Sequence, residues 1–366
     1  MSAVREFLFD LSGKSLPRSG NYAWKSPSNI ALVKYWGKSE PQIPKNASLS
    51  FTLSQSHTVT RICFEKKIVT EESRLVIFLD GILKDAFRPK VAGFIERINE
   101  YVPYLNFYHI NIHTHNTFPH SSGIASSASG LSAIALCIMS LEKEMNPGMS
   151  ESFFKQKASF LARLGSGSAC RSIEGEIVVW GKHESVKNSS DLFGIKVTDD
   201  IHPVFHQFQD TILLVDEGEK EVSSSLGHNL MTGHPYAEER FKQANENLKN
   251  LLPVLSSGDL DEFNRIVESE ALSLHAMMLT SQPSFILMKP NTLEIIEKIR
   301  AFRKKSQLDL CFTLDAGANV HVLYPKKNTE SVKAFIISEL APLCQNKKYI
   351  TDESGPGAAQ IFEGNS

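Results

Sequence analysis

The first half of the chain contains hydrophobic residues at both strand and helix spacing. Strand-like runs are present at residues 58–64 and 74–79, and residues 107–116 alternate as a β-strand does. A helix is predicted over residues 90–101, because Val91, Phe94 and Ile98 would share one of its faces. The pattern therefore predicts strands that bury one face and a helix able to cover that face.

Two further helices and another strand are predicted between residues 118 and 181. Residues 131–141 are almost continuously apolar, which indicates a helix anchored in the core. A second helix is expected over residues 151–164, with Ser150 as its N-cap. Residues 174–181, EGEIVVWG, are predicted to form a strand.

The second half of the chain is dominated by predicted helices. A polar, irregular segment precedes a strand at residues 211–216. Helical spacing continues in four segments, residues 236–255, 260–279, 292–305 and 331–340. Before the last of these helices, residues 310–325 are predicted to form a strand, a turn and a second strand.

This order of elements predicts an α+β fold in two layers. The polar, irregular segment over residues 185–205 separates the two halves, so we place a domain boundary within it. The division is an irregular N-terminal arm (residues 1–25), an N-terminal domain (26–200) and a C-terminal domain (201–366).

Composition and charge narrow the functional classes. The chain is 42% hydrophobic and 22% charged, as in typical globular proteins. Its formal net charge of −2 argues against a surface that binds nucleic acid or membranes. Charged residues interrupt the N-terminal apolar stretch, so we expect no signal peptide. Five cysteines without a C-x-x-C pair favour a reduced, cytoplasmic protein.

The start of the apolar helix has the chemistry of a phosphate-binding loop. Residues 118–138 read FPHSSGIASSASGLSAIALCI, so serine and glycine precede the apolar run. A helix N-terminus carries unpaired N–H groups and a partial positive charge, and small residues let a phosphate approach them. Serine hydroxyls add donors and can bind Mg²⁺. A helix of small residues packed tightly against a sheet would leave the same pattern.

Two other segments are rich in hydrogen-bond donors and poor in acidic groups. Lys34, Tyr35 and Lys38 lie in the segment SPSNIALVKYWGK, which suits an anionic small ligand or a solvated strand end. Ser166, Ser168 and Arg171 lie in LGSGSACRS, which suits a carboxylate or phosphate, or a helix cap with a surface arginine.

One acidic residue stands out in the second half. Asp315 lies in the predicted turn of FTLDAGANVHVLYP, between two apolar strands. An aspartate in a turn usually caps its own backbone. Near several cations it could instead serve as an acid–base group or an electrostatic anchor.

Together these segments resemble the mevalonate diphosphate decarboxylase family of the GHMP kinase superfamily. Seven motifs match in family order: NIALVKYWGK, NASLSFTLS, GIASSASG, GSGSACRS, VSSSLG, LHAMMLTS and TLDAGAN. The similarity extends from about residue 26 to about residue 358. It implies a two-domain GHMP kinase fold, with mixed sheets, helices packed on one face and an active-site cleft between the domains.

The resemblance also implies an activity. Family members use ATP and Mg²⁺ to phosphorylate the 3-hydroxyl of 5-diphosphomevalonate, and loss of that phosphate and of CO₂ yields isopentenyl diphosphate. A cytoplasmic enzyme, often a homodimer, is the corresponding expectation.

Family roles can be assigned to individual residues of this chain. The predicted catalytic residues are Asp315, Arg171, Lys34 and Asn29. The predicted diphosphate-binding residues are Tyr35, Lys38, Ser166, Ser168 and Ser224. The predicted ATP-binding residues are Ser121, Ser122, Gly123, Ser126, Ser127 and Ser129, with Ser127 also expected to bind the metal.

Some positions depart from the family pattern and leave alternatives open. Residues 119–124 read PHSSGI where the family usually has P-T-A-A-G-L. Ser225 stands where some members have an arginine, and His228 stands where a methionine is typical. A phosphomevalonate decarboxylase, a mevalonate kinase-type enzyme and a catalytically silent ligand-binding paralogue are therefore alternatives. The presence of Asp315, Arg171 and Lys34 together favours decarboxylation.

Overall fold

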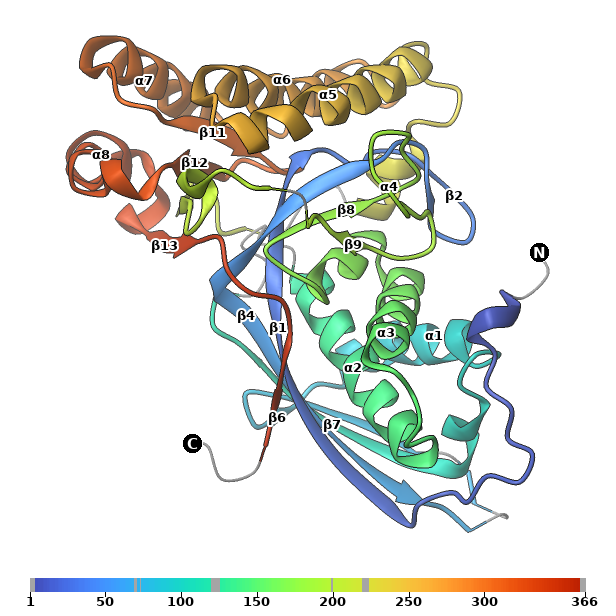
Figure 1. Cartoon of the computed structure of the whole chain (residues 1–366). Coiled ribbons are helices and arrows are strands. Elements are labelled where there is room, and N and C mark those ends of the chain that lie inside the picture. The colour runs from blue at the N-terminus through green and yellow to red at the C-terminus, as the bar shows by residue number, and fades with distance from the viewer. Residues whose placement is uncertain are drawn as a thin grey trace.

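The protein is an α+β structure with two principal sheets, as the element pattern predicts. The computed structural model describes residues 4–68, 71–72, 74–119, 126–198, 200–218 and 224–362. Among these described residues, one sheet has eight strands and the other has four. Figure 1 shows the two sheets at opposite ends of an elongated molecule, with the long strands β1 and β4 running between them.

A long antiparallel hairpin forms the backbone of the larger sheet. Its strands are β1 (Ser19–Val33) and β4 (Ser48–Lys66). Their register shifts between Pro27 and Asn29, where proline lacks an N–H for the ladder. This irregularity separates the outer part of the hairpin from the part that reaches the second sheet.

Shorter strands complete the larger sheet on both sides of this hairpin. β7 (Tyr108–Asn116) pairs antiparallel with β4, and β5 (Leu75–Leu79) pairs parallel with β7. The remaining strands are β6 (Ile82–Leu83), β8 (Ile177–Trp180), β9 (Ile195–Lys196) and β14 (Ala359–Ile361). A separate two-stranded ribbon joins β2 (Lys38–Ser39) to β3 (Ile43–Pro44).

The helices α1 (Arg88–Ile98), α2 (Ser126–Met145) and α3 (Glu151–Gly165) lie on one side of this sheet (Figure 1). The α2 helix is apolar on most sides because it lies between the sheet and α3. The predicted N-cap is confirmed, since the Ser150 side chain accepts a hydrogen bond from the Phe153 N–H at the start of α3.

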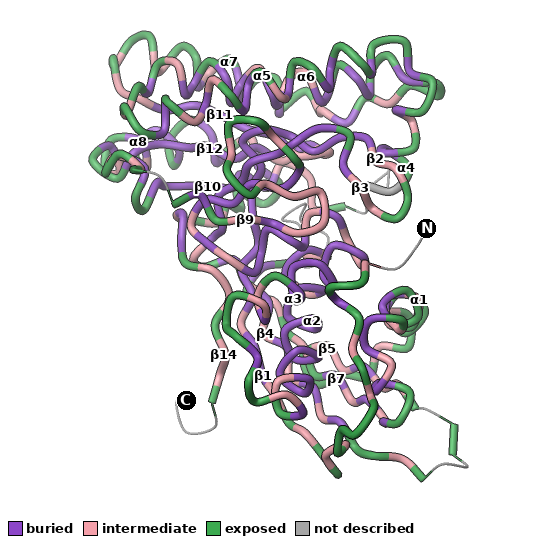
Figure 2. The backbone as a smooth tube through the Cα atoms, turned by 45° about the vertical axis from the view of Figure 1, so that its right-hand side comes forward, coloured by how far each residue is buried: buried purple, intermediate pink, exposed green. Residues whose placement is uncertain are grey.

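The second sheet is fully antiparallel and is covered by the long C-terminal helices. Its strand order is β11 (Cys311–Leu314), β12 (Val320–Tyr324), β10 (Gln209–Leu213) and β13 (Tyr349–Glu353). The helices are α5 (Ala237–Ser257), α6 (Leu260–Leu279), α7 (Pro290–Ser306) and α8 (Thr329–Phe335). Figure 2 shows α5–α7 alternating between buried and exposed positions, as amphipathic helices do.

One hydrophobic cluster contains buried residues from both ends of the molecule. Ile30 of β1 and Leu49 of β4 belong to the same buried cluster as Leu248 of α5 and Phe263 of α6. The inner part of the hairpin therefore packs directly against the C-terminal helices, which brings the end of β1 close to residues far along the chain. No helix in the described ranges is long and apolar enough to cross a membrane.

The N-terminal arm is shorter than residues 1–25, because β1 already begins at Ser19. Strand spacing was not evident there, since β1 is buried on both sides over most of its length. The preceding segment is also anchored: Phe7 is buried and stacks on Phe160 at a ring-centroid distance of 4.5 Å. Strands β13 and β14 and the short helix α4 (Ser224–Asn229) were also not predicted.

Candidate active site

A cleft of about 610 Å³ opens between the two sheets. It is lined by the end of β1, the first turns of α1 and α2, the turn after α3, the short helix α4 and the loop after β11. Predicted site residues with side chains on this cleft are Asn29, Lys34, Tyr35, Lys38, Ser126, Ser127, Ser166, Ser168, Arg171 and Asp315. The tertiary fold thus brings residues from four sequence motifs to one cavity.

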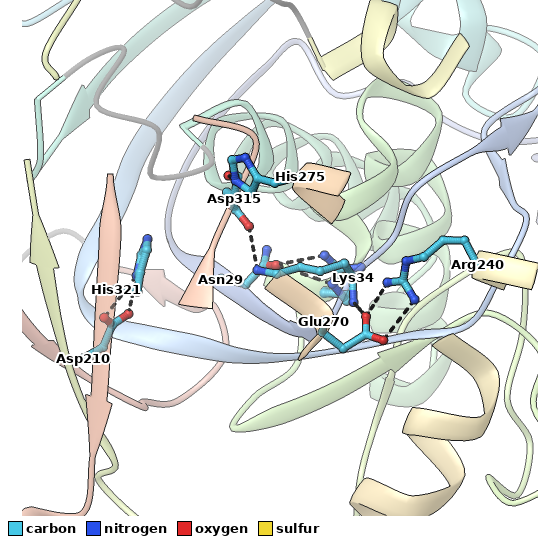
Figure 3. Close-up of polar contacts among 9 residues, drawn as sticks. Asn29, Lys34, Asp210, Arg240, Glu270, His275, Asp315 and His321 are labelled. Atoms are coloured by element: carbon cyan, nitrogen blue, oxygen red, sulfur yellow. Dashed lines mark hydrogen bonds and ion pairs between the residues drawn. The ribbon is translucent and has the colours of Figure 1, made fainter. Parts of the chain in front are cut away.

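Lys34 and Asp315 form an ion pair at the centre of this cleft. The Lys34 Nζ atom lies 3.0 Å from Asp315 Oδ1, as Figure 3 shows. The Lys34 side chain is 2% exposed, whereas that of Asp315 is 34% exposed. Burial lowers the pKa of Lys34, and the nearby Asp315 carboxylate opposes that shift. The lysine is therefore fixed inside the protein, and the carboxylate faces the cleft.

The backbone on either side of this pair is held by buried groups. The Lys34 N–H donates to Glu270 Oε2 at 2.8 Å, and Glu270 also accepts from Arg240 and Asn247. His275 Nε2 lies 3.1 Å from the Asp315 carbonyl oxygen and donates to it. Burial lowers the pKa of His275 to about 4, so this ring is neutral near pH 7.

Glu270 is a functional candidate that the sequence analysis missed. Its sequence signal is a charge on the apolar face of a helix, between Ile266 and Leu274 at i−4 and i+4. Glu270 is fully buried. Such a carboxylate requires buried partners, and here they fix the end of β1.

Arg171 presents a buried guanidinium to the same cleft. It is 3% exposed, and burial lowers its pKa. Its Nη1 donates to Ser48 Oγ at 2.5 Å, and Nε and Nη2 each lie 3.4 Å from Asn29 Oδ1. Within the described ranges, all of these partners are neutral oxygens. A carboxylate entering the cleft would supply the missing negative charge.

Asn29 is fixed so that its oxygen faces Arg171. Its Nδ2 donates to Ser172 Oγ at 2.8 Å and contacts the Ser168 carbonyl oxygen at 3.3 Å. Because the amide nitrogen is occupied in this way, the amide oxygen is available to the guanidinium. Asn29 therefore orients Arg171.

Tyr35 and the turn after α3 form another wall of the cleft. The Tyr35 hydroxyl is buried without a hydrogen-bond partner among the described residues. A Cβ atom on Gly167 would lie 2.7 Å from Trp180 and 2.9 Å from Tyr35, so only glycine fits there. The Lys38 Nζ atom donates to Gln42 at 3.0 Å beside this wall.

The serines in the first turn of α2 differ in position: some line the cleft and one is buried. Ser126 and Ser127 line the cleft, and the Lys90 Nζ atom of α1 donates to Ser127 Oγ at 2.7 Å. In contrast, the Ser129 side chain is fully buried, with its hydroxyl 2.6 Å from Thr58 Oγ1. The Ser129 hydroxyl therefore lies between α2 and β4, and the predicted contact of this residue with ATP stays a prediction, in which its backbone N–H would be the donor.

Several predicted ATP-binding positions lie outside the described residues. These are Ser121, Ser122 and Gly123. The backbone of Ser224 begins α4, but its side chain also lies outside what is described. Lys90 was missed because a lysine near the start of an amphipathic helix carries no distinguishing pattern in the sequence.

Comparisons with known proteins match both halves of the chain to one family. The family described as "Diphosphomevalonate decarboxylase-like N-terminal domain" matches residues 26–191, and "Mevalonate 5-diphosphate decarboxylase C-terminal domain" matches residues 211–362. The chain belongs to the diphosphomevalonate decarboxylase family. The family that the seven sequence motifs predicted is therefore confirmed.

Curated relatives in this family are similar along most of their length. The diphosphomevalonate decarboxylase of Ganoderma lucidum is 29% identical over 344 residues, which cover 88% of this chain and 82% of the relative. The enzyme of Saccharomyces cerevisiae is 27% identical over 352 residues, which cover 90% of this chain and 84% of the relative.

Solved structures of diphosphomevalonate decarboxylases share the fold. A structure described as MDDEF in complex with MVAPP, AMPPCP and magnesium is 29% identical, with a TM-score of 0.80. A structure of the mevalonate diphosphate decarboxylase of Enterococcus faecalis, described as showing ATP binding mediated by mevalonate diphosphate, is 28% identical to this chain, with a TM-score of 0.79. Each match covers 94% of this chain and 99% of the other. The predicted two-domain GHMP kinase fold is confirmed.

Proposed function

We propose that the protein catalyses the ATP-dependent decarboxylation of (R)-5-diphosphomevalonate to isopentenyl diphosphate, with ADP, phosphate and CO₂ as the other products. The observation that carries this proposal is the arrangement of two groups in one cleft. The Asp315 carboxylate is held by Lys34 at 3.0 Å, and the Arg171 guanidinium has only neutral partners among the described residues. An alcohol and a carboxylate on one small substrate would match these two groups.

In this proposal, Asp315, Lys34 and Arg171 each have a defined role in the reaction. Asp315 contacts the 3-hydroxyl, whose oxygen takes the γ-phosphoryl group while its proton leaves toward the carboxylate. The C3–O bond then breaks with loss of phosphate, the C1–C2 bond breaks, and its electron pair forms the C2–C3 double bond as CO₂ departs. Lys34 orients the Asp315 carboxylate, and Arg171 holds the C1 carboxylate in line.

The polar wall of the cleft suits the diphosphate. Tyr35, Lys38, Ser166 and Ser168 supply hydroxyl and ammonium donors there. Anionic oxygens that accept from charged and neutral donors together are bound more strongly than by neutral donors alone. We assign these four residues, and Ser224 by resemblance, to diphosphate binding.

The first turn of α2 suits the triphosphate of ATP. Ser126, Ser127 and Lys90 face the cleft from α2 and α1. Mg²⁺ prefers oxygen ligands and usually takes several of them from phosphates, so the Ser127 hydroxyl fits as a protein ligand. When bound, Mg²⁺ would neutralise charge on the transferred phosphoryl group.

The proposal is tested by incubating the protein with Mg·ATP and each of mevalonate, its 5-phosphate and its 5-diphosphate. We expect ADP, inorganic phosphate and CO₂ in equal amounts with the 5-diphosphate. Release of ADP without CO₂ would instead identify a kinase, and turnover of the 5-phosphate alone would identify a phosphomevalonate decarboxylase. No turnover with any of the three would contradict the proposal.

Replacing Lys90 with Met is expected to weaken Mg·ATP binding by about 10-fold, because one charge-assisted contact to the phosphates is lost. Isothermal titration calorimetry measures this directly. Lys143→Met is the matched control, since Lys143 is on the last turn of α2 and pairs with Glu151. Equal nucleotide affinity in the Lys90 variant and the control would place the triphosphate elsewhere.

Three further expectations are proposals of the same kind. We place the domain division near residue 200, before β10 begins at Gln209. A homodimer follows from the family resemblance, and a cytoplasmic location follows from the five cysteines without a C-x-x-C pair. Sedimentation of the purified protein tests the homodimer, and microscopy of a tagged chain tests the cytoplasmic location.

A further inference from the structure

His228 is a buried side chain of the cleft wall that the proposed mechanism does not use. It lies on α4, is 8% exposed and lines the cleft. Its ring packs against Tyr35 and Trp36, with centroid distances of 4.2 and 4.8 Å. A Cβ atom on Gly227 would lie 2.5 Å from Trp36, so glycine at that position lets α4 approach the aromatic pair. The ring is therefore held in one orientation.

One ring nitrogen of His228 has a defined partner. The Gly37 N–H donates to Nδ1 at 3.0 Å. Gly37 has a φ of +92°, and a Cβ there would lie 2.7 Å from Phe241, so this backbone position requires glycine. Because Nδ1 accepts a hydrogen bond, the proton of the neutral ring is on Nε2.

The surroundings of the ring keep it neutral. Burial, with the nearby positive charges of Lys38 and Arg171, lowers the pKa of His228 to about 3. A third cation at this point would be repelled by the other two. A neutral N–H donor adds a hydrogen bond to an anion without that repulsion.

The other ring nitrogen of His228, Nε2, has no acceptor among the described residues. The neighbouring Tyr35 hydroxyl also lacks a partner there. Two adjacent donors without acceptors, in a cleft wall that also carries Lys38 and Arg171, form a set that suits an anionic ligand. The carboxylate of the substrate is assigned to Arg171 on the side of Asp315, which leaves the phosphoryl oxygens for this set.

We propose that His228 is a substrate-binding residue that donates its Nε2–H to a phosphoryl oxygen of the 5-diphosphate and so favours diphosphorylated substrate. This inference rests on the proposed function, because it assigns that wall of the cleft to the diphosphate. The competing account is that the ring only fills space between Tyr35 and Trp36 and caps the Gly37 amide.

Two substitutions separate these accounts. His228→Asn places an acceptor near the Nδ1 position for the Gly37 N–H but removes the distal donor. His228→Gln extends an amide N–H toward the Nε2 position. We expect the Asn variant to raise the KM for the 5-diphosphate by about 10- to 100-fold, the range for losing a hydrogen bond to a charged group. The Gln variant should recover most of that loss.

Other kinetic parameters distinguish binding from misfolding. For the Asn variant, kcat and the KM for ATP should change by less than about threefold, since the reacting groups stay in place. A KM for the 5-diphosphate equal to that of the active wild-type protein would overturn the inference. A wild-type protein that does not turn over the 5-diphosphate would instead overturn the proposed function.

A spectroscopic readout needs no turnover. In ¹⁵N-histidine-labelled protein, the signal missing from the Asn variant identifies His228. We expect the pattern of a neutral ring protonated at Nε2, unchanged from pH 6 to 8, and a shift of the Nε2–H signal when inorganic pyrophosphate is added. A ring protonated at Nδ1, or a signal insensitive to pyrophosphate, would contradict the assignment.

Discussion

Replacing Asp315 with Asn is expected to lower kcat by about 10³-fold, within the range that a positioned acid–base group contributes. The amide keeps the size of the side chain but removes the negative charge that is proposed to receive the proton of the 3-hydroxyl. It also removes the ionic partner of Lys34, whose Nζ lies 3.0 Å from Asp315 Oδ1. Both effects act at the reacting oxygen and not at the nucleotide site.

The measurement is single-turnover formation of CO₂, combined with calorimetric titration of Mg·ATP. Nucleotide affinity should stay within about threefold of wild type, because the proposed triphosphate site is formed by α1 and α2. A decrease in kcat smaller than tenfold would remove Asp315 from the catalytic role.

A buried ion pair outside the cleft provides a matched control for this substitution. The Lys157 Nζ atom lies 2.7 Å from Glu142 Oε2, between α3 and α2, and both side chains are buried. Lys157→Met should lower the free energy of unfolding by about 3–5 kcal/mol, since it leaves a buried carboxylate unpaired. Its kcat per folded molecule should remain near that of wild type, which separates loss of stability from loss of chemistry.

Replacing Arg171 with Gln is expected to lower kcat/KM by about 10²- to 10³-fold, since truncating a buried charged donor commonly costs a few kcal/mol. The remaining amide cannot offer two parallel N–H groups to a carboxylate. A C1 carboxylate that is not held in line is also released less readily as CO₂, so kcat should fall together with affinity.

The product offers a direct test of this assignment. Isopentenyl diphosphate lacks the C1 carboxylate, so its affinity should be nearly equal for wild type and the Arg171 variant, whereas that of 5-diphosphomevalonate should differ. Arg303→Gln is the control, because Arg303 of α7 pairs with Glu268 of α6 and does not line the cleft. Equal losses of affinity for both ligands would move Arg171 to the diphosphate.

The spacing of hydrophobic residues was sufficient to predict the amphipathic helices, which bury one face and expose the other. The helices α5, α6 and α7 begin and end within a few residues of the predicted ranges, since amphipathic spacing depends only on neighbours along the chain. β1 was missed because both of its sides are buried over most of its length, which removes the alternation. β14 was missed because its pairing with β1 joins residues from opposite ends of the chain.

By itself, the sequence determined the family, the α+β class and which residues carry reactive groups, because motifs and periodicity are properties of short segments. Only the tertiary structure decided which of these groups meet. Lys34 and Asp315 are 281 positions apart, and Lys34 and Glu270 are 236 apart, yet each pair is within hydrogen-bond distance. The tertiary structure also buries the Ser129 hydroxyl against β4 and places Lys90 and His228 on the cleft. Such contacts depend on how the hairpin of β1 and β4 packs against distant helices, and no local pattern records that packing.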